Sequence, residues 1–116
     1  VASGAPYEVQ EASTVDLSVV RAYPTGSGPS SVVLAPGGQF LVAGINSSTS
    51  FDVAVFPVGG SAPVWTYDFG TQGGLEEPNR TADFGLAWSP DRDRIYAVTV
   101  NAYNENPTLN VLYPFG

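Results

Sequence analysis

A short segment occurs twice in this chain, and the repeat constrains the fold more than any other feature. The segment 35–43 (APGGQFLVA) aligns without a gap with the segment 89–97 (SPDRDRIYA). In both copies an apolar run is followed by a turn that begins with Pro and then by a second apolar run. Repetition of such a unit indicates supersecondary modules that stack on one another.

The distribution of Gly and Pro along the rest of the chain favours strands over helices. It contains 13 Gly and 10 Pro, which interrupt every window long enough for a stable helix. Residues 1–14 are small and polar and predict an extended N-terminal arm. Eight short runs rich in Val, Tyr, Phe and Trp predict strands at Leu17–Tyr23, Ser31–Ala35, Phe40–Ile45, Phe51–Phe56, Pro63–Phe69, Phe84–Ser89, Ile95–Val100 and Leu109–Tyr113.

The repeat extends beyond the turn on both sides. Val20–Tyr23 precedes the first copy as Val64–Tyr67 precedes the second, and Phe56-Pro57 follows the first copy as Tyr113-Pro114 follows the second. If the four strands of a unit are called A to D, residues 15–116 have the strand order D-ABCD-ABC. The extra residues of the second unit fall in loops, where added length destabilises a fold little.

The motifs LAPGGQFLVA (34–43) and LAWSPDRDRIYAV (86–98) carry a family resemblance. The chain resembles the YVTN and WD-type β-propeller repeats of secreted bacterial proteins, in which a Ser-Pro-Asp-Gly turn precedes a short apolar strand. The resemblance implies an all-β fold with two four-stranded antiparallel propeller-type blades, and a secreted or extracellular bacterial location. A β-sandwich is the alternative arrangement of the same strands.

Composition narrows the classes of function. The formal net charge is −7, from 11 acidic and 4 basic residues, so the sequence argues against nucleic acid and anionic membranes as partners. Cys and His are absent, which removes thiolate metal ligands and the commonest general base. No apolar run is long enough for a membrane-spanning helix, so we expect no membrane insertion. Because the chain also lacks Met, we expect a processed chain or a fragment.

Two blades alone cannot cover their own outer faces. We expect these faces to expose apolar side chains, namely Leu34, Leu41, Val55, Leu86, Ile95 and Leu112. Three arrangements would cover them: further blades of a longer chain, copies of the same chain in a ring, or closure of the strands into a sandwich. The expected partners are therefore neighbouring blades from the same or other chains, together with a protein or carbohydrate ligand.

The candidate contact residues lie in two polar loops. The ten-residue insertion of the second unit lies in the long loop 70–81, which contains Glu76, Glu77 and Arg80, and loops of this length are often functional. Tyr103 lies in the polar loop 101–106 and is the best candidate for an exposed aromatic contact. These four residues are the predicted contacts for a ligand or partner.

Charged residues offer weaker candidates for metal binding and catalysis. Asp91 and Asp93 in the second turn are candidates for a calcium site, although such a cluster is more often a solvated turn. No other cofactor is indicated and no catalytic residue is assigned. If the chain were an enzyme, its general acid and base would come from carboxylates near strand ends, namely Asp16, Asp52, Asp68 and Asp83.

The sequence thus leads to one main functional hypothesis and two alternatives. The main hypothesis is a non-enzymatic extracellular β-propeller segment that serves as a binding or structural module. The first alternative is part of a carboxylate-dependent propeller enzyme that acts on carbohydrates or lactones. The second is a β-sandwich adhesion or inhibitor module that binds through the loop 70–81.

Overall fold

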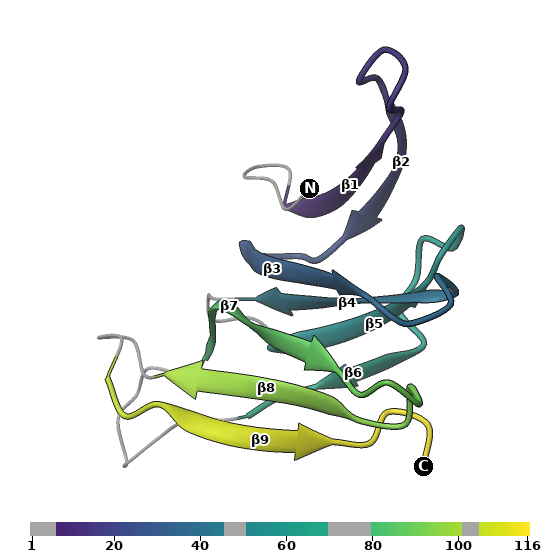
Figure 1. The fold of residues 1–116 in the computed structure, drawn as a ribbon. Coiled ribbons are helices and arrows are strands. Elements are labelled where there is room, and N and C mark those ends of the chain that lie inside the picture. Colours follow the sequence, from purple (N-terminus) through teal and green to yellow (C-terminus); the bar gives the residue numbers. More distant parts are fainter. Residues whose placement is uncertain (1–6, 46–50, 70–79, 101–104) are drawn as a thin grey trace.

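The chain forms strands joined by turns, as Figure 1 shows. The computed structural model describes residues 7–45, 51–69, 80–100 and 105–116, and within these residues the chain contains no helix. The expected all-β fold class is therefore confirmed. The strands are β1 (Glu8–Ala12), β2 (Val19–Pro24), β3 (Pro29–Leu34), β4 (Phe40–Ile45), β5 (Val53–Pro57), β6 (Trp65–Tyr67), β7 (Arg80–Trp88), β8 (Ile95–Val100) and β9 (Thr108–Leu112).

The strands form three antiparallel sheets that follow chain order. These are the hairpin β1-β2, the middle sheet β3-β4-β5-β6 and the last sheet β7-β8-β9. Adjacent strands in each sheet are also consecutive in the sequence, so every connection is a short antiparallel one. Strands β2 to β9 follow the order of the eight strands predicted from the sequence.

The repeated segment has the same structure in the middle and last sheets. Leu34 lies opposite Leu41 in the middle sheet, and Trp88 lies opposite Ile95 in the last sheet. In the first turn the Ala35 amide donates to the Phe40 carbonyl at 2.8 Å. In the second turn the equivalent bond runs from the Ser89 amide to the Arg94 carbonyl at 2.9 Å. The repeat seen in the sequence is therefore a repeat of backbone hydrogen bonds.

The N-terminal segment contributes a strand to this pattern. Residues 1–14 were expected to form only an extended arm, but Glu8–Ala12 forms β1 and pairs with β2. Val9 lies opposite Tyr23 in this hairpin, and Val53 lies opposite Tyr67 between β5 and β6. The hairpin β1-β2 thus has the register of the pair β5-β6, and it supplies a further partial unit.

The structure shifts one part of the sequence alignment by a residue. Phe56 lies opposite Leu41, and Leu112 lies opposite Ile95. Because Leu41 and Ile95 are equivalent, Phe56 corresponds to Leu112 and not to Tyr113 as the Phe-Pro and Tyr-Pro match suggests. A shift of one residue would turn every side chain of β9 to the other face, so strand pairing takes precedence over the similarity of two dipeptides.

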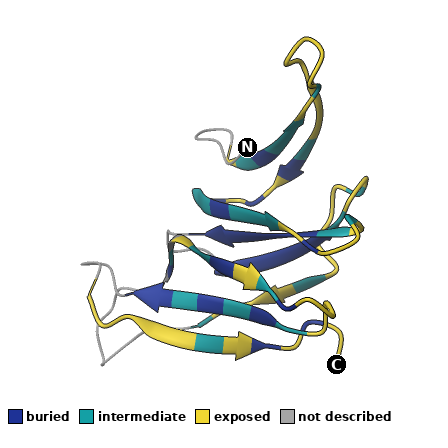
Figure 2. Cartoon of the chain, viewed as in Figure 1, coloured by how far each residue is buried: buried dark blue, intermediate teal, exposed yellow. Residues whose placement is uncertain are grey.

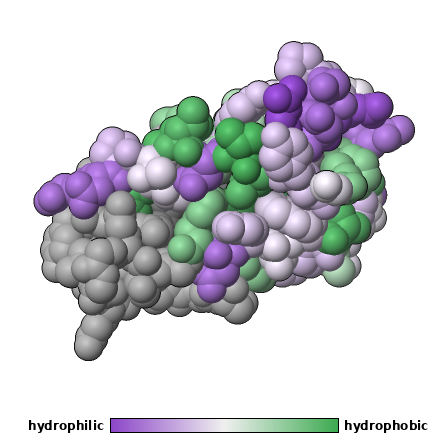
Figure 3. All heavy atoms as spheres, turned by 90° about the horizontal axis from the view of Figure 1, so that it is seen from below, coloured by the Kyte–Doolittle hydropathy of each residue, from purple (hydrophilic) through white to green (hydrophobic). Residues whose placement is uncertain are grey.

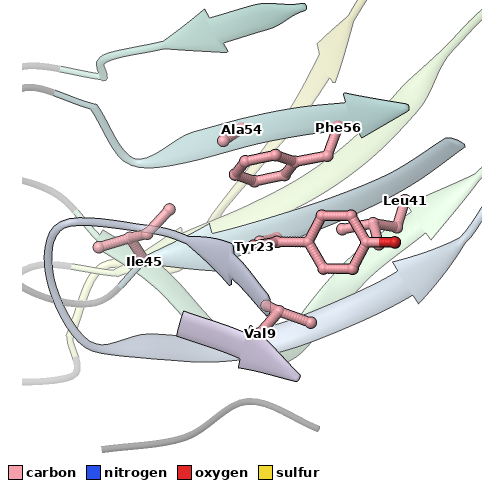
Figure 4. Packing of buried hydrophobic residues seen from close by; sticks show 7 residues of the cluster. Val9, Tyr23, Leu41, Ile45, Ala54 and Phe56 are labelled. Atoms are coloured by element: carbon pink, nitrogen blue, oxygen red, sulfur yellow. The ribbon is translucent and has the colours of Figure 1, made fainter. Parts of the chain in front are cut away.

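The hairpin covers one face of the middle sheet. The ring of Tyr23 contacts the ring of Phe56 edge to face, with 5.6 Å between their centroids. Figure 4 shows the two rings close together between β2 and β5. The first hydrophobic cluster, which joins the hairpin to the middle sheet, consists of Val9, Tyr23, Leu41, Ala43, Ile45, Ala54 and Phe56.

The last sheet covers the opposite face of the middle sheet. The C-terminal Phe115 adds to this packing, because its ring lies 4.9 Å from that of Phe40 on the middle sheet and 6.4 Å from that of Trp88 on the last sheet. The second hydrophobic cluster, which joins these two sheets, consists of Val42, Val53, Val55, Leu86, Ile95, Ala97 and Leu112.

The middle sheet is therefore buried on both faces. Strand β4 is buried from Leu41 to Ile45, and β5 is buried from Val53 to Phe56 (Figure 2). Its two covers make a layered, sandwich-like stack, and the described strands do not close into a barrel. The expectation of exposed faces was wrong for Leu41, Val55, Leu86, Ile95 and Leu112, which are all at most 7% exposed, whereas Leu34 is 58% exposed.

Candidate functional site

The residues expected to contact a ligand fall largely outside the described part of the chain. Glu76, Glu77 and Tyr103 lie outside the described residues. Arg80 begins β7, where its backbone pairs with Val100, and its side chain is not among those described. These four residues remain candidates on the strength of the sequence.

The two carboxylates considered for calcium are held by groups of their own turn. Asp91 and Asp93 accept hydrogen bonds from the Ser89 hydroxyl at 2.7 and 3.1 Å. Arg94 Nε donates to Asp93 Oδ1 at 3.1 Å, and Arg94 Nη2 lies 3.9 Å from Asp91 Oδ2. The hydrogen bond from Ser89 is the main reason that the pKa of Asp91 falls to about 2. In the described residues no three side chains of the His, Cys, Asp and Glu type gather at one point.

Of the carboxylates considered for catalysis whose side chains are described, Asp52 is the most buried. It is 1% exposed, and burial raises the pKa of its carboxyl to about 7 against the opposing effect of a hydrogen bond from the Phe69 amide at 2.8 Å. Asp68 raises this pKa further. Asp16 is separate from this group, because it lies in the β1–β2 loop and accepts bonds from the Ser18 amide and hydroxyl. The side chain of Asp83 is not described.

The contacts of Asp52 connect three strands. Its carbonyl accepts hydrogen bonds from the Ile45 amide at 2.8 Å and from the Thr81 hydroxyl at 3.0 Å. Thr81 lies on β7, so this residue links the middle and last sheets. Gly44 permits the close approach, since a Cβ there would lie 2.6 Å from Thr81 Cγ2. The main-chain carbonyl of Asp52 therefore connects the middle and last sheets.

The last sheet has an open apolar face, which we call the outer face. It consists of Ala87, Tyr96, Val98, Leu109 and Val111, which point away from the second hydrophobic cluster because side chains alternate along strands. Leu109 is 65% exposed and Val111 is 44% exposed. A depression of about 250 Å³ lies on this face between Tyr96, Val98, Leu109 and the neighbouring Phe84. In Figure 2 β9 is mostly exposed.

The middle sheet has an equivalent face that is covered. By the repeat, Val53 and Val55 correspond to Leu109 and Val111, and both valines are fully buried beneath the last sheet. Three positions carry bulkier side chains on the outer face, because Tyr96, Val98 and Leu109 correspond to Val42, Gly44 and Val53 of the middle sheet. The outer face is thus the repeat equivalent of a buried interface, with larger side chains at these positions.

The sequence did not single out the outer face, although one signal was present. In the run Thr108–Leu112 the apolar residues Leu109 and Val111 alternate with polar ones, which indicates that they share a face. Their exposure could not be read from that pattern, because the same alternation describes a covered strand. Figure 3 views the molecule from the side on which β9 lies and shows hydrophobic residues between hydrophilic ones.

Aromatic side chains are suited to stacking on sugar rings, and four of those in the described residues fall into two groups. Trp65 and Trp88 pack against the second hydrophobic cluster, and the Trp88 indole also donates to the Val33 carbonyl at 3.3 Å. Tyr67 and Tyr113 are 43% and 54% exposed. The two tryptophans therefore join sheets in this molecule.

Comparisons with known proteins do not identify the family of this chain. No family model, curated protein or solved structure matches the chain. Among the described residues, none belongs to a helix long and apolar enough to cross a membrane.

Proposed function

We propose that this protein is a non-enzymatic, extracellular β-propeller segment that serves as a binding or structural module. In this proposal each unit is a blade, and neighbouring blades cover one another's apolar faces. The secreted, bacterial origin is part of the proposal and is supported by the resemblance of the repeated turns to YVTN and WD-type repeats.

One observation carries the proposal. The outer face of the last sheet occupies the position that the middle sheet buries beneath its neighbour, yet Leu109 and Val111 are exposed where Val53 and Val55 are fully buried. Exposed apolar surface that matches a buried interface in the same molecule favours association with another sheet of this kind. The partner is therefore a further blade, from the same or another chain.

Mass measurement in solution tests this proposal. We expect static light scattering of the 116-residue chain to show a mass that rises with concentration, because the outer face self-associates. Val111→Lys places a charge on that face and should shift the protein toward the monomer.

Val64→Lys is the matched control. Val64 is also exposed, at 55%, but lies just before β6 and outside the outer face, so its replacement should leave the mass unchanged. A chain that stays monomeric at every concentration and unfolds in one sharp transition would contradict the proposal and favour a self-contained sandwich module.

A further inference from the structure

We propose that the open edge of β9 is a strand-addition site, and that its partner is an extended segment of a separate polypeptide with aromatic side chains at alternate positions. This inference rests on the proposed function, because it names the partner of the same sheet. It concerns the strand edge, however, whereas the proposed stacking concerns the outer face.

The middle sheet shows what the last sheet lacks. Strand β5 is paired on both sides, with β4 on one edge and β6 on the other. Strand β9 is the equivalent of β5, but within the described residues it pairs with β8 alone. By the repeat, the partner of β9 would take the place of β6.

The register of β6 defines the chemistry of that partner. Tyr67 lies opposite Val53 and Trp65 lies opposite Val55. The hairpin repeats the first of these pairs, with Tyr23 opposite Val9. A strand on β9 would therefore place a Tyr opposite Leu109 and a second large side chain opposite Val111.

The backbone of β9 is arranged to accept such a strand. In the middle sheet the Ile45 amide donates to the Asp52 carbonyl, and the Val58 amide donates to the Gln39 carbonyl. Antiparallel pairs alternate between bonded and non-bonded positions, and β8-β9 repeats the register of β4-β5. The N–H and C=O groups of Leu109 and Val111 consequently point away from β8, toward the open edge.

The side chains of this edge also favour a partner. Aromatic residues opposite Leu109 and Val111 would cover the two most central apolar side chains of β9, as aromatic and β-branched cross-strand pairs do in sheets. On β6 the rings of Trp65 and Tyr67 stack with 5.8 Å between centroids, so alternate aromatic residues already pack beside β5.

The edge of β9 also lacks the features that usually prevent strand addition. Native edges are commonly short or carry charge or Pro. Strand β6 has three residues, and β2 contains Arg21 and ends at Pro24. Strand β9 has five residues, with neither charge nor Pro. Its main-chain groups are thus available for strand addition, a recognised mode of peptide binding.

A labelled peptide tests the proposal directly. The probe is a fluorescein-labelled peptide with the sequence of residues 62–69, APVWTYDF, which contains β6. We expect its fluorescence anisotropy to rise with protein concentration. A peptide with Ser in place of Trp65 and Tyr67 should bind at least about tenfold more weakly, since it loses the aromatic cross-strand pairs. Equal binding of both peptides would overturn the proposal.

Two variants at one position separate the backbone from the side chain. Leu109→Pro removes an N–H that points to the open edge and leaves the bonds to β8 in place, so peptide binding should fall at least about tenfold. Leu109→Ala keeps the N–H and should lose less. Denaturant unfolding of both variants shows whether they fold, and binding by folded Leu109→Pro at the affinity of the unaltered protein would overturn the proposal.

A modified peptide gives a result that does not depend on any protein variant. Adjacent amides of a bound strand point in opposite directions, so only one of the Trp65 and Thr66 amides of the peptide can face β9. Single N-methylation of these two amides should weaken binding at one position by at least about tenfold relative to the other. Equal affinities of the two methylated peptides would overturn the proposal.

The outcomes distinguish this inference from the proposed function. Peptide binding by a chain that remains monomeric would support the strand-addition site and contradict stacking through the outer face. Self-association without peptide binding would support stacking and contradict the strand-addition site. Self-association that is lost in Leu109→Pro but kept in Leu109→Ala would assign the edge to a second copy of the chain and overturn the proposed separate partner.

Discussion

The middle and last sheets are built on the same repeat but have opposite environments. Both begin with a strand, a Pro-led turn and a second strand in the same register, with Leu34 opposite Leu41 in one and Trp88 opposite Ile95 in the other. The middle sheet is covered on both faces and has β6 beside β5, whereas among the described residues the last sheet is covered on one face and has no strand beside β9 other than β8.

This comparison shows which properties belong to a unit and which belong to its neighbours. The register beside the turn and the backbone hydrogen bonds of the turn are the same in the two units, although their side chains differ, so local pattern and turn chemistry are sufficient to set them. Burial differs at matched positions, such as Val55 and Val111, because it depends on what packs against the sheet. Substitutions at matched positions of the two sheets test whether burial depends on the neighbouring sheet.

The largest effect should come from a charge placed at the matched positions Val55 and Val111. Val55→Asp buries an unpaired carboxylate between two sheets and should lower the free energy of unfolding by about 3–5 kcal/mol. Val111→Asp puts the same charge on the open face, where the change should be within about 1 kcal/mol. Urea denaturation measures both values, and similar losses at both positions would show that the outer face is not open.

An intermediate effect should come from the pH dependence of Asp52. Its folded-state pKa of about 7 lies above the ordinary aspartate value of 3.8, so between pH 4 and 7 the folded protein binds more protons than the unfolded one. Stability should therefore fall as pH rises through this range, by part of the roughly 1.4 kcal/mol per pH unit that one full proton gives. Asp52→Asn should remove this slope.

The last sheet supplies the control for that experiment. Thr108 is the exposed equivalent of Asp52, so Thr108→Asp adds a carboxyl at the same repeat position without burying it. Unfolding at several pH values should show no added slope from this change. A slope that persists in Asp52→Asn would mean that another group causes it.

The smallest effect should come from the turns. Gly38 and Arg92 are equivalent and both have positive φ, at 73° and 66°, which is unfavourable for a residue with a Cβ. Arg92→Gly should raise the free energy of unfolding by about 0.5–1 kcal/mol, and Gly38→Ala should lower it by about as much. Thermal unfolding measures both, and a destabilised Arg92→Gly protein would show that Arg92 makes contacts that outweigh its backbone strain.

Most strands could be predicted, because their apolar runs are bounded by Gly, Pro and Asn. Strand β1 was not, since Glu8–Ala12 contains little apolar pattern and becomes a strand through pairing with β2. The strand predicted to begin at Phe84 begins earlier, at Arg80, and Phe84 lies inside it with a φ of 57° beside a register shift and with 95% of its surface exposed. In both cases pairing and backbone geometry overrode local composition.

The candidate site depended still more on tertiary structure. Alternation in Thr108–Leu112 indicates that Leu109 and Val111 share a face, but the same pattern would describe a covered sheet. The exposure of that face, and the lack of a second strand beside β9 in the described part of the chain, appear only when the sheets are stacked.

By itself the sequence determined the strands of the repeat, most of their order and the positions of their turns. These properties follow from interactions between residues close together in the chain, which Pro, Gly and alternating apolar residues encode directly. Only the tertiary structure decided which faces are buried, which residue of β9 faces β8, and where the stack stays open. Such properties depend on contacts between segments far apart in the chain, because a sheet face becomes buried only when another sheet packs against it.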